Sequence, residues 1–302
     1  MSTPGTSERQ APWTVGRLLE WTTRWFQDRG VEGGRLAAEL LLARAMGCKK
    51  IELYTRYEQE PTDEQRATFR ELVRQAGEHT PIAYLLGYRE FFSLEFKVTP
   101  AVLIPRPETE ALVERVIGIC RQEPDRTWRI LDVGTGSGCI AVAVAKYAKN
   151  AQLVASDVSE EALAVAAENI QKHQLAERVR TVHADLADLP ADAIPEGGFD
   201  LVVSNPPYIS EKVFAELPPN VRNHEPRSAL VGPNGDGLVM YRRFAAEAPA
   251  ILSATGRLLV EVAHDQPEAA KAIFAEAGGW TFVAAHRDRT DPFDRVLEFV
   301  RS

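Results

Sequence analysis

The sequence predicts an α/β protein that has a doubly wound, seven-stranded, mainly parallel sheet and a small N-terminal helical domain. Two observations carry this prediction. Residues 13–76 have the apolar periodicity of helices, whereas short apolar strands and amphipathic helices alternate after residue 128. Strands separated by helices form parallel sheets covered on both faces, and right-handed crossovers restrict the topology to a doubly wound sheet.

Three helices are expected in the N-terminal part of the chain. Thr14 can cap the first of them. The range 35–46 has strong helix composition and is followed by Gly47, a residue that commonly ends helices. Thr62 begins a capping-box pattern for a third helix that reaches residue 76. Because these helices carry no visible chemistry, residues 1–86 are interpreted as a packed helical domain.

A change of composition marks the end of this domain. Residues 88–102 are rich in aromatic and β-branched side chains, which predicts a β-hairpin. We assign the hairpin to a linker at 87–104 and a second domain to 105–302. Pro107 lies near the first position of the next helix, with carboxylates in its first turn.

The second domain is expected to hold seven strands and four further helices. The expected strands span 129–133, 152–156, 179–184, 199–204, 257–262, 280–285 and 295–300. The expected helices span 139–148, 160–173, 238–252 and 266–276.

Composition argues against several classes of protein. No run of 18 apolar residues occurs, which predicts no membrane span, and residues 1–5 lack the pattern of a secretory signal. Cys48, Cys120 and Cys139 lie far apart, and no His or Cys pair has metal-ligand spacing. We therefore expect a cytoplasmic protein without a metal site. The net charge of −8 disfavours a protein whose main task is to hold nucleic acid.

A glycine-rich loop, Gly134-Thr135-Gly136-Ser137-Gly138, follows the first expected strand of the sheet. Ligands of doubly wound sheets bind at the carboxyl ends of strands, where glycines let the backbone approach closely. The spacing matches neither a dinucleotide-binding loop nor a phosphate-binding loop. Asp157 ends the second strand, where a carboxylate can accept both hydroxyls of a ribose. Asp185 follows the third strand and is placed to accept an adenine amino group.

The tetrapeptide Asn205-Pro206-Pro207-Tyr208 follows the fourth strand. Its two prolines have no backbone N–H, so the motif offers acceptors, namely the Asn205 side-chain oxygen and the Pro206 carbonyl. Tyr208 adds an aromatic face. The group suits a planar NH2, with both N–H groups bound and the plane stacked on the ring. A proline-rich turn is the plain alternative for the tetrapeptide taken alone.

The four strand ends together resemble those of S-adenosylmethionine-dependent class I methyltransferases. The resemblance implies the class I methyltransferase fold, S-adenosylmethionine as methyl donor and S-adenosylhomocysteine as product. It also implies methylation of a planar nitrogen, either an adenine amino group or a glutamine amide. Such nitrogens are poor nucleophiles because their lone pair is delocalised. The Asn205 and Pro206 oxygens would stabilise the positive charge that develops during transfer.

Other segments resemble the PrmC/HemK family of peptide chain release factor glutamine methyltransferases. They are Pro-Ile-Ala-Tyr-Leu-Leu-Gly at 81–87, Leu-Ile-Pro-Arg-Pro-Glu-Thr-Glu at 103–110, His-Glu-Pro-Arg-Ser-Ala-Leu at 224–230 and Gly-Asp-Gly-Leu at 235–238. The resemblance covers essentially the whole chain. It implies that the substrate is the glutamine in the Gly-Gly-Gln loop of class I release factors. It further implies that the N-terminal helical domain helps to dock the factor.

The family resemblance also implies roles for individual residues. The loop 134–138 would wrap the cofactor, Asp157 would bind its ribose, and Asp185 with Leu186 would bind its adenine end. Asn205 would touch both the methionine moiety and the substrate amide, while Pro206, Pro207 and Tyr208 would complete the substrate site. Arg106 and Glu108 are further candidates near the active site, although helix-start electrostatics explains Glu108 equally well. Leu186 stands where a bulky aromatic residue is often seen.

Three alternatives remain at this point. Ribosomal-protein glutamine methyltransferases share Asn-Pro-Pro-Tyr but look different at 103–110. Nucleic-acid adenine N6-methyltransferases share the strand-end chemistry, but the acidic charge and the helical N-terminal half disfavour direct binding of nucleic acid. A cofactor-binding module without activity is the third alternative, and the intact acceptor residues argue against it.

Overall fold

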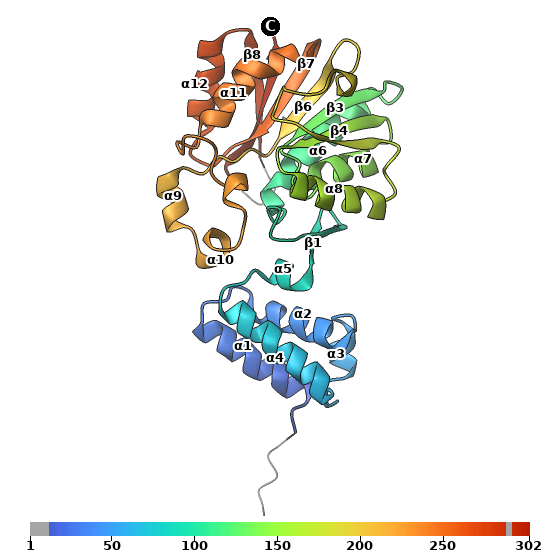
Figure 1. Cartoon of the computed structure of the whole chain (residues 1–302), viewed down its shortest axis with the longest axis vertical. Coiled ribbons are helices and arrows are strands. Elements are labelled where there is room, and N and C mark those ends of the chain that lie inside the picture. The colour runs from blue at the N-terminus through green and yellow to red at the C-terminus, as the bar shows by residue number, and fades with distance from the viewer. Residues whose placement is uncertain (1–11, 288–291) are drawn as a thin grey trace, which may run out of the picture. The chain divides into compact units, whose positions relative to one another are not determined.

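The computed structural model describes residues 12–287 and 292–302 (Figure 1). The chain divides into two compact units, Met1–Leu86 and Gly87–Ser302. The expectation about residues 1–5 lies outside the described residues. Among the helices in the described parts of the chain, none has both the length and the apolar character needed to cross a bilayer.

The first unit consists of helices. They are α1 (Val15–Asp28), α2 (Gly34–Met46), α3 (Glu52–Thr55), α4 (Asp63–Gly77) and α5 (Ile82–Leu86). The capping predictions are confirmed: the Thr14 side chain accepts from the Arg17 N–H, and Thr62 forms a reciprocal capping box with Gln65. Gly47 ends α2 in the left-handed conformation, with φ 63°. The short helices α3 and α5 were not predicted, because four or five residues show no periodicity.

The second unit contains the predicted seven-stranded sheet, whose strand order is β5-β4-β3-β6-β7-β9-β8. Its strands are β3 (Trp128–Val133), β4 (Ala151–Asp157), β5 (Val179–His183), β6 (Phe199–Ser204), β7 (Leu252–Glu261), β8 (Trp280–Arg287) and β9 (Asp294–Arg301). The pairs from β5 to β7 are parallel, and β9 is antiparallel to both neighbours. The chain runs outward from β3 to β5 and then returns to β6 on the other side of β3. This confirms a doubly wound, mainly parallel sheet whose order reverses between β3 and β6.

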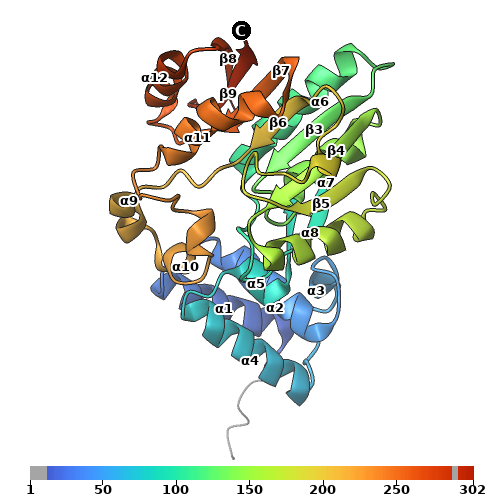
Figure 2. The same ribbon diagram turned by 45° about the horizontal axis from the view of Figure 1, so that its top comes forward.

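Helices cover both faces of the sheet (Figures 1 and 2). Successive strand residues point to opposite faces, so Ile130 of β3 joins one apolar cluster and Leu131 joins the other. The first cluster includes α6 (Glu110–Gln122), α7 (Cys139–Tyr147) and α8 (Glu160–Lys172). The second includes α11 (Val239–Glu247) and α12 (Pro267–Ala277). These two layers hold the strand ends in fixed positions.

A β-hairpin precedes the sheet, as predicted. It consists of β1 (Tyr88–Phe91) and β2 (Leu94–Lys97). Phe91 and Phe96 are buried in the cluster that contains α7. Asn169 of α8 binds the Lys97 backbone twice, accepting from its N–H at 2.7 Å and donating to its carbonyl at 3.0 Å. The hairpin is therefore packed into the second unit.

Several boundaries differ from the expectations. The helix predicted at 238–252 exists, but its predicted end at 252 and the predicted strand start at 257 are both wrong, because α11 ends at Glu247 and β7 begins at Leu252. Between them lies η4 (Ala248–Ala250), in which Pro249 cannot donate a helical hydrogen bond. Four short helical turns were also not predicted. They are η2 (Ala191–Ala193), α9 (Glu211–Glu216), α10 (Pro219–Arg222) and η3 (Arg227–Ala229), the last three lying between β6 and α11.

Candidate active site

The predicted site segments meet at the carboxyl ends of the central strands. In the sheet register, Val133 of β3 pairs with Ser156 of β4 on one side and with Ser204 of β6 on the other. The glycine loop, Asp157 and Asn205 each follow one of these paired positions. The three segments therefore lie side by side at the point where the strand order reverses, which is where doubly wound sheets bind ligands.

The glycine loop presents bare backbone. Gly134, Gly136 and Gly138 all have positive φ, at 70°, 55° and 79°. A Cβ added at Gly134 or Gly136 would meet no atom within 4 Å, so both face open space. The side chains of Thr135 and Ser137 are instead buried beneath the loop. The Thr135 hydroxyl donates to Asp132 Oδ2 at 2.7 Å and thereby ties the loop to β3.

Asp157 is fixed next to this loop. Its Oδ2 accepts from the Gly136 N–H at 2.9 Å, and its Oδ1 accepts from the Ser159 N–H at 3.0 Å. The residue is half-buried. Each carboxylate oxygen can accept more than one hydrogen bond, so a fixed Asp157 retains capacity for a diol.

The Asn205 amide is oriented by a neighbouring hydroxyl. Its Nδ2 donates to Thr109 Oγ1 at 3.0 Å, and Thr109 is buried. Neither Asn205 Oδ1 nor the Pro206 carbonyl oxygen accepts a hydrogen bond from any described residue. The two acceptors that the sequence predicts are thus both unengaged within the described residues, although Pro206 is itself buried.

Tyr208 is anchored by both its side chain and its backbone. Its hydroxyl donates to Glu261 Oε1 at 3.1 Å, and its carbonyl accepts from Gln266 Nε2 at 2.9 Å. Burial and the neighbouring Glu261 raise the pKa of the Tyr208 phenol, which therefore stays protonated. Gly237, with φ 74°, passes so close that a Cβ there would lie 2.6 Å from the Tyr208 carbonyl.

Two buried carboxyl groups lie under the site. Burial raises the pKa of Asp132 to about 7, although the Thr135 hydroxyl and the Ala141 N–H act in the opposite direction. Burial also raises the pKa of Glu261 to about 7 against the hydroxyls of Thr109 and Tyr208. Asp132 Oδ1 and Glu261 Oε2 accept no hydrogen bond within the described residues.

The two residues predicted at the adenine end of the cofactor, Asp185 and Leu186, differ in exposure. Asp185 is exposed, and its Oδ1 accepts from Arg243 Nη1 at 2.8 Å. Arg243 was not predicted, and it also binds Glu247. Leu186 has a positive φ of 51°, and its buried side chain belongs to the apolar cluster that contains α11 and α12. Arg243 binds only Oδ1 of this carboxylate, and a contact of Asp185 with an adenine amino group stays a prediction.

Arg106 belongs to an ion pair at one side of the site. Its Nη2 donates to Glu225 Oε1 at 2.6 Å, while Glu225 Oε2 accepts from the Ile104 N–H at 3.1 Å. The pair joins the segments 103–110 and 224–230. Glu108 is half-buried, and its charge contributes to the raised pKa of Glu261.

Comparison with known proteins identifies the family. A sequence model of the PrmC N-terminal domain matches residues 17–87, and one of the methyltransferase small domain matches residues 110–217. A release factor glutamine methyltransferase of Rhodopirellula baltica is 43% identical over 301 residues, which covers 98% of this chain and 99% of the relative. A release factor glutamine methyltransferase of Geobacter sulfurreducens is 39% identical, and the alignment covers 90% of this chain and 92% of the relative. The chain belongs to the release factor glutamine methyltransferase family.

The resemblance to the PrmC/HemK family is thereby confirmed, and so is S-adenosylmethionine as the methyl donor of this methyltransferase. The hMettl16 catalytic domain, solved with a MAT2A 3′UTR hairpin, has a TM-score of 0.52 at 17% identity. The aligned region covers 71% of this chain and 77% of the hMettl16 chain. At this identity the likeness shows the class I fold alone.

The residues of the methyltransferase fit the cofactor. The open space beside Gly134 and Gly136 leaves room for a ligand against bare backbone, and Asp157 stands fixed at its edge. The individual cofactor contacts of 134–138, Asp157, Asp185 and Leu186 stay predictions. Within the described residues, no group of three or more His, Cys, Asp or Glu side chains could hold a metal ion.

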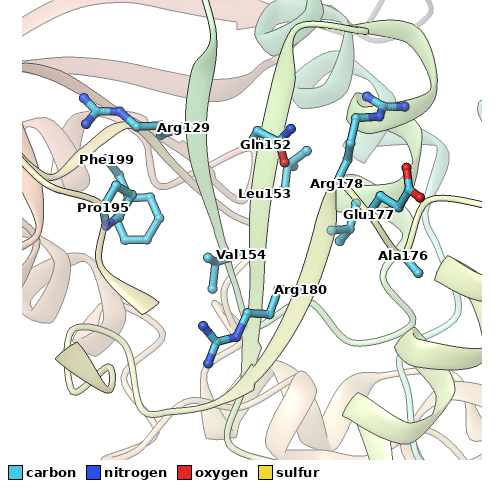
Figure 3. Close-up of a pocket in the computed structure, with 11 residues that line it drawn as sticks. Arg129, Gln152, Leu153, Val154, Ala176, Glu177, Arg178, Arg180, Pro195 and Phe199 are labelled. Carbon is cyan, nitrogen blue, oxygen red and sulfur yellow. The ribbon is translucent and has the colours of Figure 1, made fainter. Parts of the chain in front are cut away.

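A pocket of about 200 Å³ lies at the opposite edge of the sheet (Figure 3). It is lined at the amino ends of β3 to β6 by residues that include Arg129, Gln152 and Arg180. Asp200 binds the Arg129 guanidinium, and Asp192 binds that of Arg180. These arginines are engaged within the protein, and this edge is not where doubly wound sheets bind ligands.

Three residues beside the motif were not predicted as part of the site, namely Thr109, Glu261 and Gln266. Each touches the Asn-Pro-Pro-Tyr motif from another element, namely the start of α6, the end of β7 and the start of α12. Glu261 could have been predicted from the sequence, because a carboxylate at the carboxyl end of an apolar strand lies at the ligand-binding edge of such a sheet. No sequence pattern marks Thr109 or Gln266 as site residues, since their contacts depend on how helices pack.

Proposed function

We propose that the protein methylates the side-chain amide nitrogen of the glutamine in the Gly-Gly-Gln loop of class I peptide chain release factors. S-adenosylmethionine supplies an electrophilic methyl group on a sulfonium. The single observation that carries the proposal is the pair of unengaged acceptors, Asn205 Oδ1 and the Pro206 carbonyl, beside the glycine loop. A primary amide has two N–H groups for two such acceptors.

The chain's own residues would act mainly by positioning. An amide nitrogen is a poor nucleophile, so holding it in line with the methyl group is the main task. Positive charge develops on the nitrogen during transfer, and the Asn205 and Pro206 oxygens then bind its hydrogens more strongly than before. Pro207 shapes the turn, and the Tyr208 ring stacks on the amide plane. Methyl transfer leaves a protonated N-methylamide, which is a strong acid and loses one N–H proton to water, so the scheme needs no dedicated general base.

Substrate choice rests on the family. The relatives with 43% and 39% identity are named release factor glutamine methyltransferases and align along nearly the whole chain. The first unit, which the PrmC N-terminal domain model matches, would dock the release factor. We place this reaction in the cytoplasm and expect no direct contact with nucleic acid. Arg106 and Glu108 would line the substrate side of the site.

Mass spectrometry of the release factor tests the proposal. The protein is incubated with labelled S-adenosylmethionine and a purified class I release factor, and the Gly-Gly-Gln peptide is analysed for a single methyl group on glutamine. Parallel reactions contain ribosomal proteins or nucleic acid. Label on the release factor glutamine supports the proposal. Label on a ribosomal protein or on adenine, with none on the release factor, overturns it. A release factor with Gln replaced by Asn in this loop is the matched substrate control.

A further inference from the structure

The Asn-Pro-Pro-Tyr turn has few ways of its own to hold its position. Pro206 and Pro207 have no backbone N–H, so neither can donate to a neighbouring element. Just beyond the motif, the Ile209 N–H donates to the Leu230 carbonyl at 2.9 Å. Hydrogen bonds that the oxygens of the motif receive from other elements therefore do more to fix this turn than they would in a turn without prolines.

The carboxamide of Gln266 supplies such a hydrogen bond and is itself bound at both ends. Its Nε2 donates to the Tyr208 carbonyl at 2.9 Å and to the Gly237 carbonyl at 3.3 Å. Its Oε1 accepts from the Tyr241 hydroxyl at 3.0 Å and from the Ala263 N–H at 3.3 Å. An NH2 group has two hydrogens, and two carbonyl oxygens face it here. Turned over, the amide would set its oxygen against both carbonyls, so its orientation is fixed.

Gln266 occupies the N-cap position of α12, yet its side chain does not cap this helix. Side chains at this position usually accept from N–H groups of their own helix, and Ser, Asp and Asn are preferred there. The Gln266 carbonyl accepts from the Ala270 N–H at 2.9 Å, which ties the residue to α12. The helix thus holds the backbone of Gln266 in place while its longer side chain reaches the turn after β6.

Tyr208 is held at two ends as a result. Its hydroxyl donates to Glu261 Oε1 at 3.1 Å, and its carbonyl accepts from Gln266. The buried Tyr241 links the two contacts, because its hydroxyl lies 3.1 Å from the Glu261 carbonyl oxygen and 3.0 Å from Gln266 Oε1. Without Gln266, the hydroxyl contact would hold the ring at its far end alone. A backbone shift at Tyr208 would also move the nearby Pro206 carbonyl.

We propose that Gln266 is a positioning residue which holds the Tyr208 backbone, and with it the ring and the Pro206 acceptor, in the geometry that methyl transfer needs. The inference rests on the proposed function, in which this ring stacks on the substrate amide and the Pro206 oxygen accepts one of its hydrogens. Gln266 is assigned no contact with the reacting atoms. Within the described residues it forms no hydrogen bond with the glycine loop or with Asp157, so its loss should affect transfer and spare cofactor binding.

Two variants separate the ends of the carboxamide. Q266M keeps the length of the side chain and removes both polar ends. Q266E keeps an acceptor for the Ala263 N–H and replaces the NH2 by an oxygen that would face two carbonyls. We expect kcat to fall about tenfold or more in both variants, as for a displacement of positioned groups. The dissociation constant of S-adenosylmethionine, measured by calorimetry, should stay within about threefold of the wild-type value.

F274L is the control for a general loosening of α12. Phe274 is buried in the same helix, and its ring stacks on Phe299 with 4.0 Å between the centroids. The substitution weakens the packing of α12 and removes none of the hydrogen bonds of Gln266. F274L should therefore lose stability in urea unfolding and keep kcat within about twofold of wild type. Equal losses of kcat in F274L and Q266M, or wild-type kcat in Q266E, would overturn the inference.

The Tyr208 carbonyl gives a reading that does not depend on methyl transfer. Tyr208 and Ile209 form the single Tyr-Ile pair of the sequence, so protein labelled with carbonyl-13C tyrosine and 15N isoleucine gives one carbon–nitrogen correlation signal. The carbonyl resonance should move in Q266M and Q266E, which lose its hydrogen bond, and should stay in place in F274L. An unmoved resonance in Q266M, or unchanged kcat beside a moved one, overturns the inference. If wild type methylates no release factor yet the resonance still depends on Gln266, the proposed function fails and the Gln266 contact stands.

Discussion

Arg106 and Glu225 form an ion pair with an Nη2–Oε1 distance of 2.6 Å, although 119 positions separate them. The Glu225 side chain is almost fully buried, whereas 29% of the Arg106 side chain is exposed. Glu225 also accepts from the backbone of Ile104. The pair holds the segment before α6 against the segment after α10, and both border the Asn-Pro-Pro-Tyr motif.

Replacing Arg106 should therefore cost stability. R106M leaves a buried carboxylate without its cation, and we expect the free energy of unfolding to fall by about 2 kcal/mol. Urea unfolding of the full chain measures this. R121M is the matched control, because Arg121 is exposed in the last turn of α6, and it should change stability by less than about 0.5 kcal/mol. Equal effects of R106M and R121M would show that the pair contributes nothing.

Asn205 should be needed for transfer more than for cofactor binding. N205A removes one acceptor, and we expect kcat to fall about 100-fold, the effect of losing one preorganised polar group at a reacting centre. N205D should also transfer poorly, because a charge changes the amide-acceptor geometry beside the sulfonium. Turnover and calorimetric cofactor titration are measured on the same preparations. Normal turnover by either variant would contradict the acceptor mechanism.

Gly136 should be required for cofactor affinity. In G136A the new Cβ projects into the open space beside the loop, and the positive φ adds strain of about 1 kcal/mol. We expect cofactor affinity to fall about tenfold or more, because the added Cβ would occupy space that the bound cofactor is predicted to fill. G47A is the control, since Gly47 has a similar positive φ and open surroundings but ends α2 in the first unit. G47A should lose similar stability and keep cofactor affinity. A G136A protein with wild-type affinity would place the cofactor elsewhere.

Asp132 should make stability depend on pH. Its pKa is about 7 in the folded protein and about 3.9 in an unfolded chain, so between these values the folded state binds the extra proton. The free energy of unfolding contributed by this group therefore decreases as the pH rises from about 4 to 7. D132N keeps an acceptor for Thr135 but has no charge to bury. Its unfolding free energy should decline less steeply than that of wild type over this interval. Identical slopes would show that Asp132 is ionised at low pH in the folded protein.

The site could be predicted from sequence where strand ends carry the chemistry. The glycine loop, Asp157 and Asn205 directly follow apolar strands, so the sheet pattern alone placed them together. The pattern failed at residues 238–257, because Pro249 ends the helix early and the strand starts sooner than its apolar run suggests. The layer beneath the motif could not be predicted either. Thr109 and Glu261 act through side-chain packing between elements far apart in the chain, and no local period encodes such contacts.

The two prolines of the motif have a consequence for what happens after transfer. They remove the backbone donors at positions 206 and 207, while the Asn205 side-chain oxygen and the Pro206 carbonyl remain as acceptors. Before transfer, a primary amide supplies two hydrogens for them. After transfer the nitrogen carries one hydrogen and one methyl group, so one acceptor loses its donor at a cost of about 1 kcal/mol or more. The same pair of oxygens that admits the substrate thus favours departure of the singly methylated product and disfavours a second methylation.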